Sequence, residues 1–319
     1  MLRTELLRPQ GASVLVADPD VCGEIAATNA MVFWVDRNPT ITDSIRAVPS
    51  AGGAPQTLYA AEPDPNAAIE DLAADGVNLY FTEVGSNDAS TIKSLPQTGG
   101  EPTVLLQDPS VLTILAVDGA FVYYDDDQGN LARIPVTGGT PALLSPAGFS
   151  PLAFTASASG ACWVADTSDF SGVEIVCQPQ GATQAKTVAT AMYAPTSIAM
   201  SATQIAWADA LDSAVWTAPI TGGTPTRVFP GATSIVGVLA VDATRAYWLA
   251  EPGTSDTADP SPVSPSTLWE ASLDASSSSQ LASALYPAVG AFSDAQALAQ
   301  SDTALFWTDT RGLVLTAAK

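Results

Sequence analysis

Hydrophobic and polar positions alternate along most of the chain in short runs of strand length, and the runs recur in one order. A run of mainly apolar and aromatic residues that mostly ends in an acid appears seven times, at 32–36, 79–83, 122–126, 162–166, 205–209, 246–250 and 305–309. A small apolar run precedes each copy, a third run follows it, and several copies continue into a fourth. This pattern predicts units of four short antiparallel strands.

Paired glycines separate the third and fourth runs, at 98–102, 137–141 and 221–225, with a looser copy at 51–55. Two successive glycines supply the positive φ angles that a tight hairpin turn needs. The turn chemistry therefore agrees with the strand order.

The units begin near residues 25, 72, 115, 154, 198, 239 and 298, a mean spacing of about 45 residues that is typical of propeller blades. We expect one all-β domain over 1–319, a seven-bladed β-propeller of four-stranded antiparallel blades. The last unit has three strands, so residues 12–17 are expected to complete it and close the ring. Residues 1–9 are surplus to this scheme and are expected to be peripheral.

Two cysteines bear on the compartment. If residues 161–166 and 173–178 form a hairpin centred on the turn 167–172, Cys162 and Cys177 lie directly opposite each other. Such a pair could be a disulfide or two buried thiols, and the sequence leaves both open. An oxidised pair would imply an exported protein.

No stretch of 18 apolar residues occurs, and the first eight residues lack the apolar region of a signal peptide. We therefore expect no membrane insertion. An exported protein (periplasmic, cell-surface or secreted) whose leader is absent from this chain is favoured, and a cytoplasmic protein is the alternative.

The net charge of the chain limits the classes of partner that it can bind. The chain has 33 acidic and 11 basic residues, a net charge of −22, and no histidine. This balance argues against nucleic acid and anionic membrane surfaces as partners. The missing histidine excludes Ser-His-Asp and Cys-His catalysis and histidine-ligated metals. We expect a monomer with a protein or carbohydrate ligand.

Acids recur at the end of the second run of each unit. In a propeller these ends share one face, so a ring of carboxylates could hold Ca²⁺, the one cofactor the sequence suggests, or a cationic ligand. The candidate metal ligands of this ring are Asp36, Asp125, Asp166, Asp209 and Asp309, with Glu83 and Glu251 at the matching positions. Alternatively, each acid caps its own turn. Asp127 is a further candidate, because residues 124–130 resemble the start of a Ca²⁺ loop, with a solvated acidic turn as the alternative.

Aromatic residues fall in the loops of that same face. They suit recognition of a sugar or a peptide, or they wedge between blades. The candidates are Tyr59, Phe149, Phe170, Tyr193, Tyr286 and Phe292. An insertion at 251–266, rich in Pro, Ser, Thr and Asp, lengthens the sixth unit on this face, either as a binding loop or as a tolerated insertion.

The segment Leu305-Phe306-Trp307-Thr308-Asp309 and its looser copies resemble the YWTD repeats of lipoprotein-receptor propellers. With the Thr-Gly-Gly-Thr-Pro turns, the chain also resembles bacterial secreted or surface propeller proteins. The resemblance implies a propeller that binds protein ligands on one face. Propeller lyases and hydrolases share the blade pattern, and several of them depend on histidine, which this chain lacks.

Together these observations favour non-enzymatic recognition of a protein or glycan by the loop-rich face. The alternative is a carboxylate- or Ca²⁺-dependent lyase or hydrolase, with an acidic site at the channel mouth.

Overall fold

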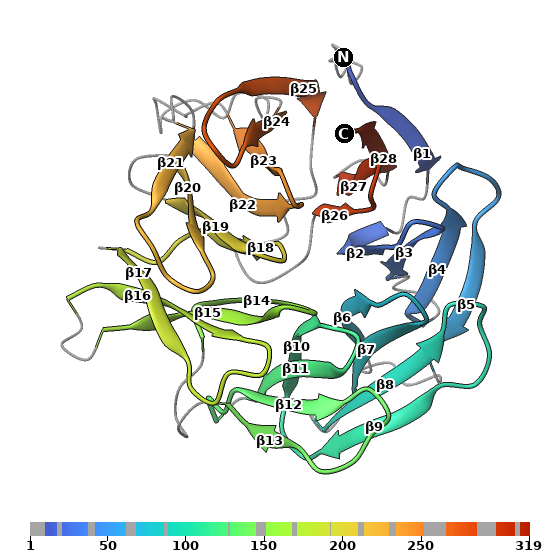
Figure 1. The fold of residues 1–319 in the computed structure, drawn as a ribbon. Helices are drawn as coiled ribbons and strands as arrows, with labels where there is room; N and C mark the ends of the chain where they lie inside the picture. The colour runs from blue at the N-terminus through green and yellow to red at the C-terminus, as the bar shows by residue number, and fades with distance from the viewer. Residues whose placement is uncertain are drawn as a thin grey trace, which may run out of the picture.

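The chain forms a ring of seven four-stranded antiparallel sheets, the seven-bladed β-propeller that the repeats predict (Figure 1). The structure is a computed structural model. It describes residues 10–17, 21–37, 42–61, 68–85, 89–126, 128–144, 151–167, 171–191, 193–209, 214–229, 234–251, 266–285, 298–309 and 313–319. In this part of the chain no helix has the length and apolarity to cross a membrane.

Each blade is one sheet in chain order, except the last. Blade 1 comprises β2 (Val21–Ala27), β3 (Met31–Asp36), β4 (Ser44–Pro49) and β5 (Gln56–Ala60). Blade 2 comprises β6 (Ala68–Ala74), β7 (Asn78–Val84), β8 (Ser90–Pro96) and β9 (Thr103–Asp108). Blade 3 comprises β10 (Leu112–Val117), β11 (Phe121–Asp126), β12 (Ala132–Pro135) and β13 (Ala142–Leu143). Blade 4 comprises β14 (Ala153–Ser157), β15 (Gly160–Asp166), β16 (Val173–Pro179) and β17 (Lys186–Ala191).

The remaining blades follow the same plan. Blade 5 comprises β18 (Ser197–Met200), β19 (Gln204–Asp209), β20 (Ala214–Pro219) and β21 (Thr226–Phe229). Blade 6 comprises β22 (Ser234–Val241), β23 (Arg245–Glu251), β24 (Ser266–Ser272) and β25 (Ser278–Leu285). Blade 7 comprises β26 (Leu298–Gln300), β27 (Ala304–Asp309), β28 (Leu313–Ala318) and β1 (Ser13–Ala17).

The first strand of each blade is the innermost one, and consecutive innermost strands contact each other around the axis (Figure 1). Because the strands are antiparallel, the turns joining the first to the second and the third to the fourth strand share one face. We call this the turn face. The opposite face, where the second strand leads to the third and each blade leads to the next, is the loop face.

The ring is closed by β1, which pairs with β28 and places the N-terminal strand at the outer edge of blade 7, as predicted. This pairing covers an edge that would otherwise be open. Gln10 forms a further antiparallel bridge with Ser283 of blade 6. The predicted peripheral segment 1–9 lies outside the described residues.

In the paired-glycine turns of blades 1, 2 and 3 both glycines have the predicted positive φ, and in blade 5 Gly222 has it but Gly223 does not. In blade 2 Gly99 has φ +80° and Gly100 φ +129°, and the Gly99 N–H donates to the Pro96 carbonyl at 2.8 Å. Gly138 and Gly139 repeat this geometry in blade 3. These angles are unfavourable for other residues, so the glycines fix the link between the third and fourth strands.

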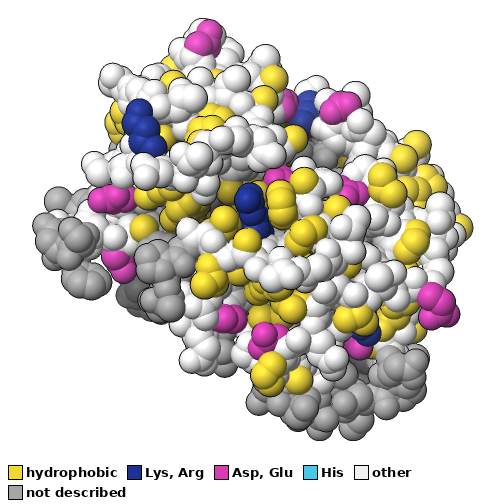
Figure 2. Space-filling model, turned by 60° about the horizontal axis from the view of Figure 1, so that its bottom comes forward, with side chains coloured by type: hydrophobic (Ala, Val, Ile, Leu, Met, Phe, Trp, Pro, Cys, Tyr) yellow, Lys and Arg dark blue, Asp and Glu magenta, His cyan; other side chains and the backbone are white. Residues whose placement is uncertain are grey.

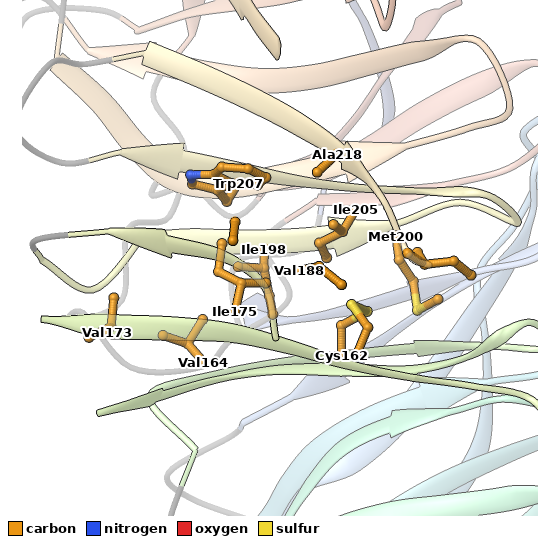
Figure 3. Close-up of a cluster of buried hydrophobic side chains, with 13 residues drawn as sticks. Cys162, Val164, Val173, Ile175, Val188, Ile198, Met200, Ile205, Trp207 and Ala218 are labelled. Atoms are coloured by element: carbon orange, nitrogen blue, oxygen red, sulfur yellow. A yellow bond between two sulfur atoms is a disulfide. The ribbon is translucent and has the colours of Figure 1, made fainter. Parts of the chain in front are cut away.

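Buried apolar side chains fill the space between neighbouring blades. Six clusters among the described residues join blades 1–2, 2–3, 4–5, 5–6, 6–7 and 7–1. Figure 3 shows the cluster between blades 4 and 5, where Ile175 and Val164 of blade 4 face Ile198, Ile205 and Trp207 of blade 5. The core is therefore a series of contacts around the ring rather than one centre.

Cys162 and Cys177 lie in that cluster. They are direct partners in the β15–β16 ladder, which confirms the predicted register. A disulfide joins them, with their Cα atoms 4.1 Å apart. The disulfide ties the second strand of blade 4 to its third and is consistent with an oxidising compartment.

Candidate functional site

Much of the predicted site on the loop face lies outside the described residues. This applies to Phe149, Phe170, Tyr286, Phe292 and Asp127, and to the insertion apart from Glu251 and Ser266 at its ends. Roles for these residues stay predictions.

The described residues include two of the predicted aromatic residues, Tyr59 and Tyr193, and their surroundings differ. The Tyr59 hydroxyl donates to Glu83 Oε2 at 2.6 Å and accepts from Lys93 Nζ at 3.2 Å. Its ring centroid lies 5.1 Å from that of Phe81, so Tyr59 packs between blades 1 and 2, as in the wedge alternative. Tyr193 is 54% exposed and is available on the surface.

Apart from Asp127, the predicted carboxylates lie on the second strands of their blades, one strand outside the innermost strand. Asp36 faces Arg46 at 3.4 Å, and Glu83 pairs with Lys93 at 2.7 Å. Asp166 is exposed, Asp125 and Asp209 are partly buried, and the side chains of Asp309 and Glu251 are not described. No three His, Cys, Asp or Glu side chains in the described part of the chain are close enough to share a metal. Calcium binding stays a prediction.

The acidic run at 124–130 closes a turn through one of its own acids. Asp126 Oδ1 accepts the backbone N–H groups of Gln128 and Asn130 at 3.0 and 2.9 Å. The Asn130 side-chain amide donates to Asp126 Oδ2 at 2.8 Å. Asp126 therefore caps this turn.

A charged cluster near the axis had not been predicted from the sequence. Arg37, which follows β3, donates to Glu24 Oε1 at 2.9 Å and to Glu70 Oε2 at 2.8 Å. Glu24 and Glu70 lie on the innermost strands β2 and β6. Burial raises the pKa of Glu24 although the charge of Arg37 opposes the shift.

A signal for this cluster was present in the sequence. The innermost strands of blades 1 and 2 contain Glu24, Glu70 and Asp71, whereas those of the other five blades contain no charged residue. A carboxylate within an otherwise apolar inner strand needs a partner, since burying a charge alone is costly. Arg37 supplies that partner between the two blades.

On the turn face, three blades share a capped turn. Asp242 Oδ1 accepts the N–H groups of Thr244 and Arg245, while its Oδ2 accepts the Tyr247 hydroxyl at 2.7 Å. Asp75 with Tyr80, and Asp118 with Tyr123, repeat this arrangement. These tyrosines lie five residues after the aspartates, so one carboxylate caps the turn and holds the next strand.

Two of these turns, those of Asp75 and Asp242, border a depression of about 670 Å³. Its walls are the turns between first and second strands of blades 6, 7, 1 and 2, at 241–244, 300–302, 27–29 and 74–76, together with Lys319. Turns from four consecutive blades border one space only around the axis, so it lies at one end of the central channel. We call it the axial depression.

Lys319 crosses from blade 7 towards blade 6 within the axial depression and is largely buried. Its ammonium donates to Gln300 Oε1 at 2.9 Å and to Asp242 Oδ2 at 3.5 Å, and lies 5.0 Å from the centre of the Tyr247 ring. Burial lowers the pKa of Lys319, and the charge of Asp242 opposes this.

The carboxylates of the axial depression outnumber its cation. Asp75, Asp242 and Asp302 line it with Lys319 as the only Lys or Arg among its described lining residues. Burial would raise the pKa of Asp242, but hydrogen bonds from Thr244, Tyr247 and Arg245 and the Lys319 charge lower it below 3.8. The axial depression therefore presents fixed negative charge to a ligand. Figure 2 shows that other acidic side chains are scattered over one side of the molecule among apolar and neutral ones.

Comparison with known proteins identifies the fold and no family. No family model and no curated protein matches the chain. Among solved structures, the tricorn protease matches with a TM-score of 0.67 at 12% identity, covering 98% of this chain and 34% of that one. The chain also spans 48% of a Mycobacterium tuberculosis puromycin-hydrolyzing peptidase, with a TM-score of 0.60.

Two other structures match over nearly their whole length. A chain of the mitotic checkpoint complex gives a TM-score of 0.60 at 11% identity, covering 100% of this chain and 98% of that one. The computationally designed Ika8 protein gives 0.58 at 14% identity, covering 96% and 98%. Likenesses at this identity show a propeller and do not select a function.

Proposed function

We propose that this protein is an exported, non-enzymatic recognition module that binds a basic segment of a protein ligand in the axial depression. This depression lies on the turn face, whereas the sequence favoured the loop face, where most of the candidate aromatic residues lie outside the described residues. The observation that carries the proposal is the charge of that depression, where three carboxylates stand against one ammonium. A net charge of −22 adds a long-range field that attracts cations. The YWTD-like repeats favour a protein as the ligand.

The protonation states of Asp242 and Tyr247 support binding rather than catalysis at the axial depression. The Asp242 carboxylate is held ionised by its hydrogen bonds, and burial and Asp242 raise the pKa of Tyr247, keeping that hydroxyl neutral. A general acid or base works best with a pKa near the operating pH, and the chain has no histidine. Fixed charges and rigid turns suit recognition.

Tetralysine is a direct probe of this proposal. Calorimetry is expected to show binding that weakens as salt is raised, since exposed charges are screened. Asp75→Asn and Asp302→Asn each remove one charge while keeping an oxygen acceptor. Each is expected to weaken binding about threefold, a cost of about 0.6 kcal/mol.

Glu101→Gln provides the control, because Glu101 is an exposed acid in the β8–β9 turn outside the axial depression. It should leave tetralysine binding unchanged. Equal weakening by Glu101→Gln and Asp75→Asn would mean that only the electric field of the net charge attracts the peptide. That result would contradict a binding site in the axial depression. Binding of maltotetraose but not tetralysine would replace the protein ligand by a glycan.

The Arg37 cluster favours a second candidate, a carboxylate-dependent enzyme. Its specific support is the raised pKa of Glu24, caused by burial, beside a second carboxylate on Glu70. A raised pKa in the folded state means that the stability contributed by protonated Glu24 is present below 4.5 and is lost as the pH rises through the folded value.

Glu24→Gln tests whether this raised pKa is real. The stability of the variant relative to wild type is expected to increase as the pH rises from about 4 to about 7, measured by urea unfolding. Arg37, Glu70 and Asp43 remain around the site in both proteins. A stability difference that does not change with pH would remove the support for an acid at this position.

A further inference from the structure

The contact between blades 3 and 4 differs from the others. Clusters of buried apolar residues join six neighbouring pairs of blades, and in the described part of the chain none joins blades 3 and 4. A pocket of about 290 Å³ lies there instead. Phe121, Tyr123 and Arg133 line it from blade 3, and Gly160, Ala161 and Gln178 line it from blade 4.

The blade 3 wall carries a residue that no other repeat has. Arg133 lies opposite Tyr123 in the β11–β12 ladder, on the side that faces the next blade. The residues at the matching ladder position of the other blades are Ala47, Ser94, Cys177, Thr217, Glu270 and Thr316. Arg133 is the only cation at this position of the repeat.

The blade 4 wall departs from the repeat at the position that faces Arg133. Gln178 pairs with Ala161 in the β15–β16 ladder. The third-strand residues at this position in the other blades are all apolar: Val48, Leu95, Ile134, Ala218, Ala271 and Ala317. The neighbouring Gly160 has φ +136°, and a Cβ there would collide with the Gln178 carbonyl. Polar and small residues thus keep this wall open.

Within the described ranges Arg133 has no carboxylate partner, and its side chain is hydrogen-bonded to Tyr123. Its guanidinium carbon lies 4.1 Å from the centre of the Phe121 ring, and its Nε is buried without a hydrogen bond. Among the described residues it forms no ion pair. By contrast, ion pairs hold five other cations: Arg37, Arg46, Lys93, Arg245 and Lys319.

We propose that this pocket is a binding site for a small carboxylate, which the Arg133 guanidinium holds between blades 3 and 4. A planar guanidinium matches a carboxylate with two parallel hydrogen bonds. Arg133 is the one cation among the described residues that line this pocket, and the chain has a net charge of −22. These charges favour a singly charged anion over phosphate. The pocket admits a group of a few heavy atoms, such as acetate or the end of a glutamate side chain. This site is separate from the axial depression.

Binding is tested with acetate and with glutamate blocked at both backbone ends, using phosphate as the anion control in a chloride buffer. Both carboxylates are expected to raise the melting temperature of the wild type at concentrations up to about 10 mM. Arg133→Met is expected to weaken binding at least tenfold, and Arg133→Lys about threefold, because lysine keeps the charge without the planar fork. Gln178→Leu, which restores the apolar wall, is expected to abolish binding.

Arg227→Met is the matched control, since Arg227 also lies over an aromatic ring, Trp216, but outside this pocket. It should bind both carboxylates as the wild type does. Tighter binding of blocked glutamate than of acetate would assign the carboxylate to a protein, and the reverse would assign it to a free acid. The proposal is overturned if the wild type binds neither, if Arg133→Met binds as well as wild type, or if phosphate binds more tightly.

Discussion

Blade 4 presents two different contacts to its two neighbours. Towards blade 5, Val164, Ile175 and the disulfide pack against Ile205 and Trp207 in a continuous buried cluster (Figure 3). Towards blade 3, Ala161 and Gln178 face Arg133 and Tyr123 across a pocket. The same strands build both contacts, because alternate residues of a strand point to opposite sides.

The difference separates what makes a blade from what joins blades. The strands of each blade form their backbone hydrogen bonds with one another. The sheet therefore forms whether the side chains facing the neighbouring blades are apolar or polar. A repeat protein can therefore give up apolar packing at one contact while its neighbours hold the ring. Such a contact is where a binding site costs the fold least.

The largest expected effect is on the packed side of blade 4. Trp207 is 3% exposed in the cluster, and Trp207→Ala should reduce the free energy of unfolding by about 3–5 kcal/mol. At the contact between blades 3 and 4, which we call the open contact, Phe154 is half-buried against Tyr123. Phe154→Ala should reduce the free energy of unfolding by about 1–2 kcal/mol. Guanidinium unfolding of both variants measures the difference, and equal losses would contradict the contrast between the two contacts.

The disulfide is the next largest contribution. Cys162 and Cys177 are 15 residues apart in sequence, and closing a loop of this length lowers the entropy of the unfolded chain. Reduction should therefore lower the free energy of unfolding by about 3 kcal/mol. The double variant Cys162→Ala/Cys177→Ala should be insensitive to reductant. Free thiols by mass spectrometry in protein prepared under oxidising conditions would show that this bond does not form.

The smallest effect is expected at the open contact. The Tyr123 hydroxyl donates to Asp118 Oδ2 at 2.7 Å, and burial, with Asp118, raises the pKa of Tyr123 to about 12. Tyr123→Phe removes this hydrogen bond and should cost about 1 kcal/mol. Asp118 still caps its turn, so the fold should be kept. A loss as large as that of Trp207→Ala would mean that polar contacts hold blades 3 and 4 together as firmly as apolar packing does elsewhere.

The fold was predictable because each local signal repeats. The strand runs, the paired glycines and the position of residues 12–17 all depend on neighbours along the chain or on the copy number of the unit. The pairing of Cys162 with Cys177 followed in the same way, since a hairpin register depends only on its own turn. These predictions agree with the structure.

The site was less predictable, because its residues meet only across blades. For the acids at the ends of the second strands the sequence left open a ring around the channel mouth or turn caps, and in the structure Asp36 and Glu83 pair with Arg46 and Lys93 of the third strands. The axial charges instead come from Glu24 and other residues of the innermost strands and turns. The repeat pattern hides these positions, since each occurs in only a few blades.

The sequence alone determined that this chain makes seven antiparallel blades closed by its N-terminal strand, because strand periodicity and turn chemistry are local properties. Only the tertiary structure decided that Lys319 would meet Asp242, that Arg37 would join Glu24 to Glu70, and that Arg133 would face Gln178. Those encounters depend on how one blade packs against the next. No local pattern specifies that geometry, because the two sides of each contact are tens of residues apart in the chain.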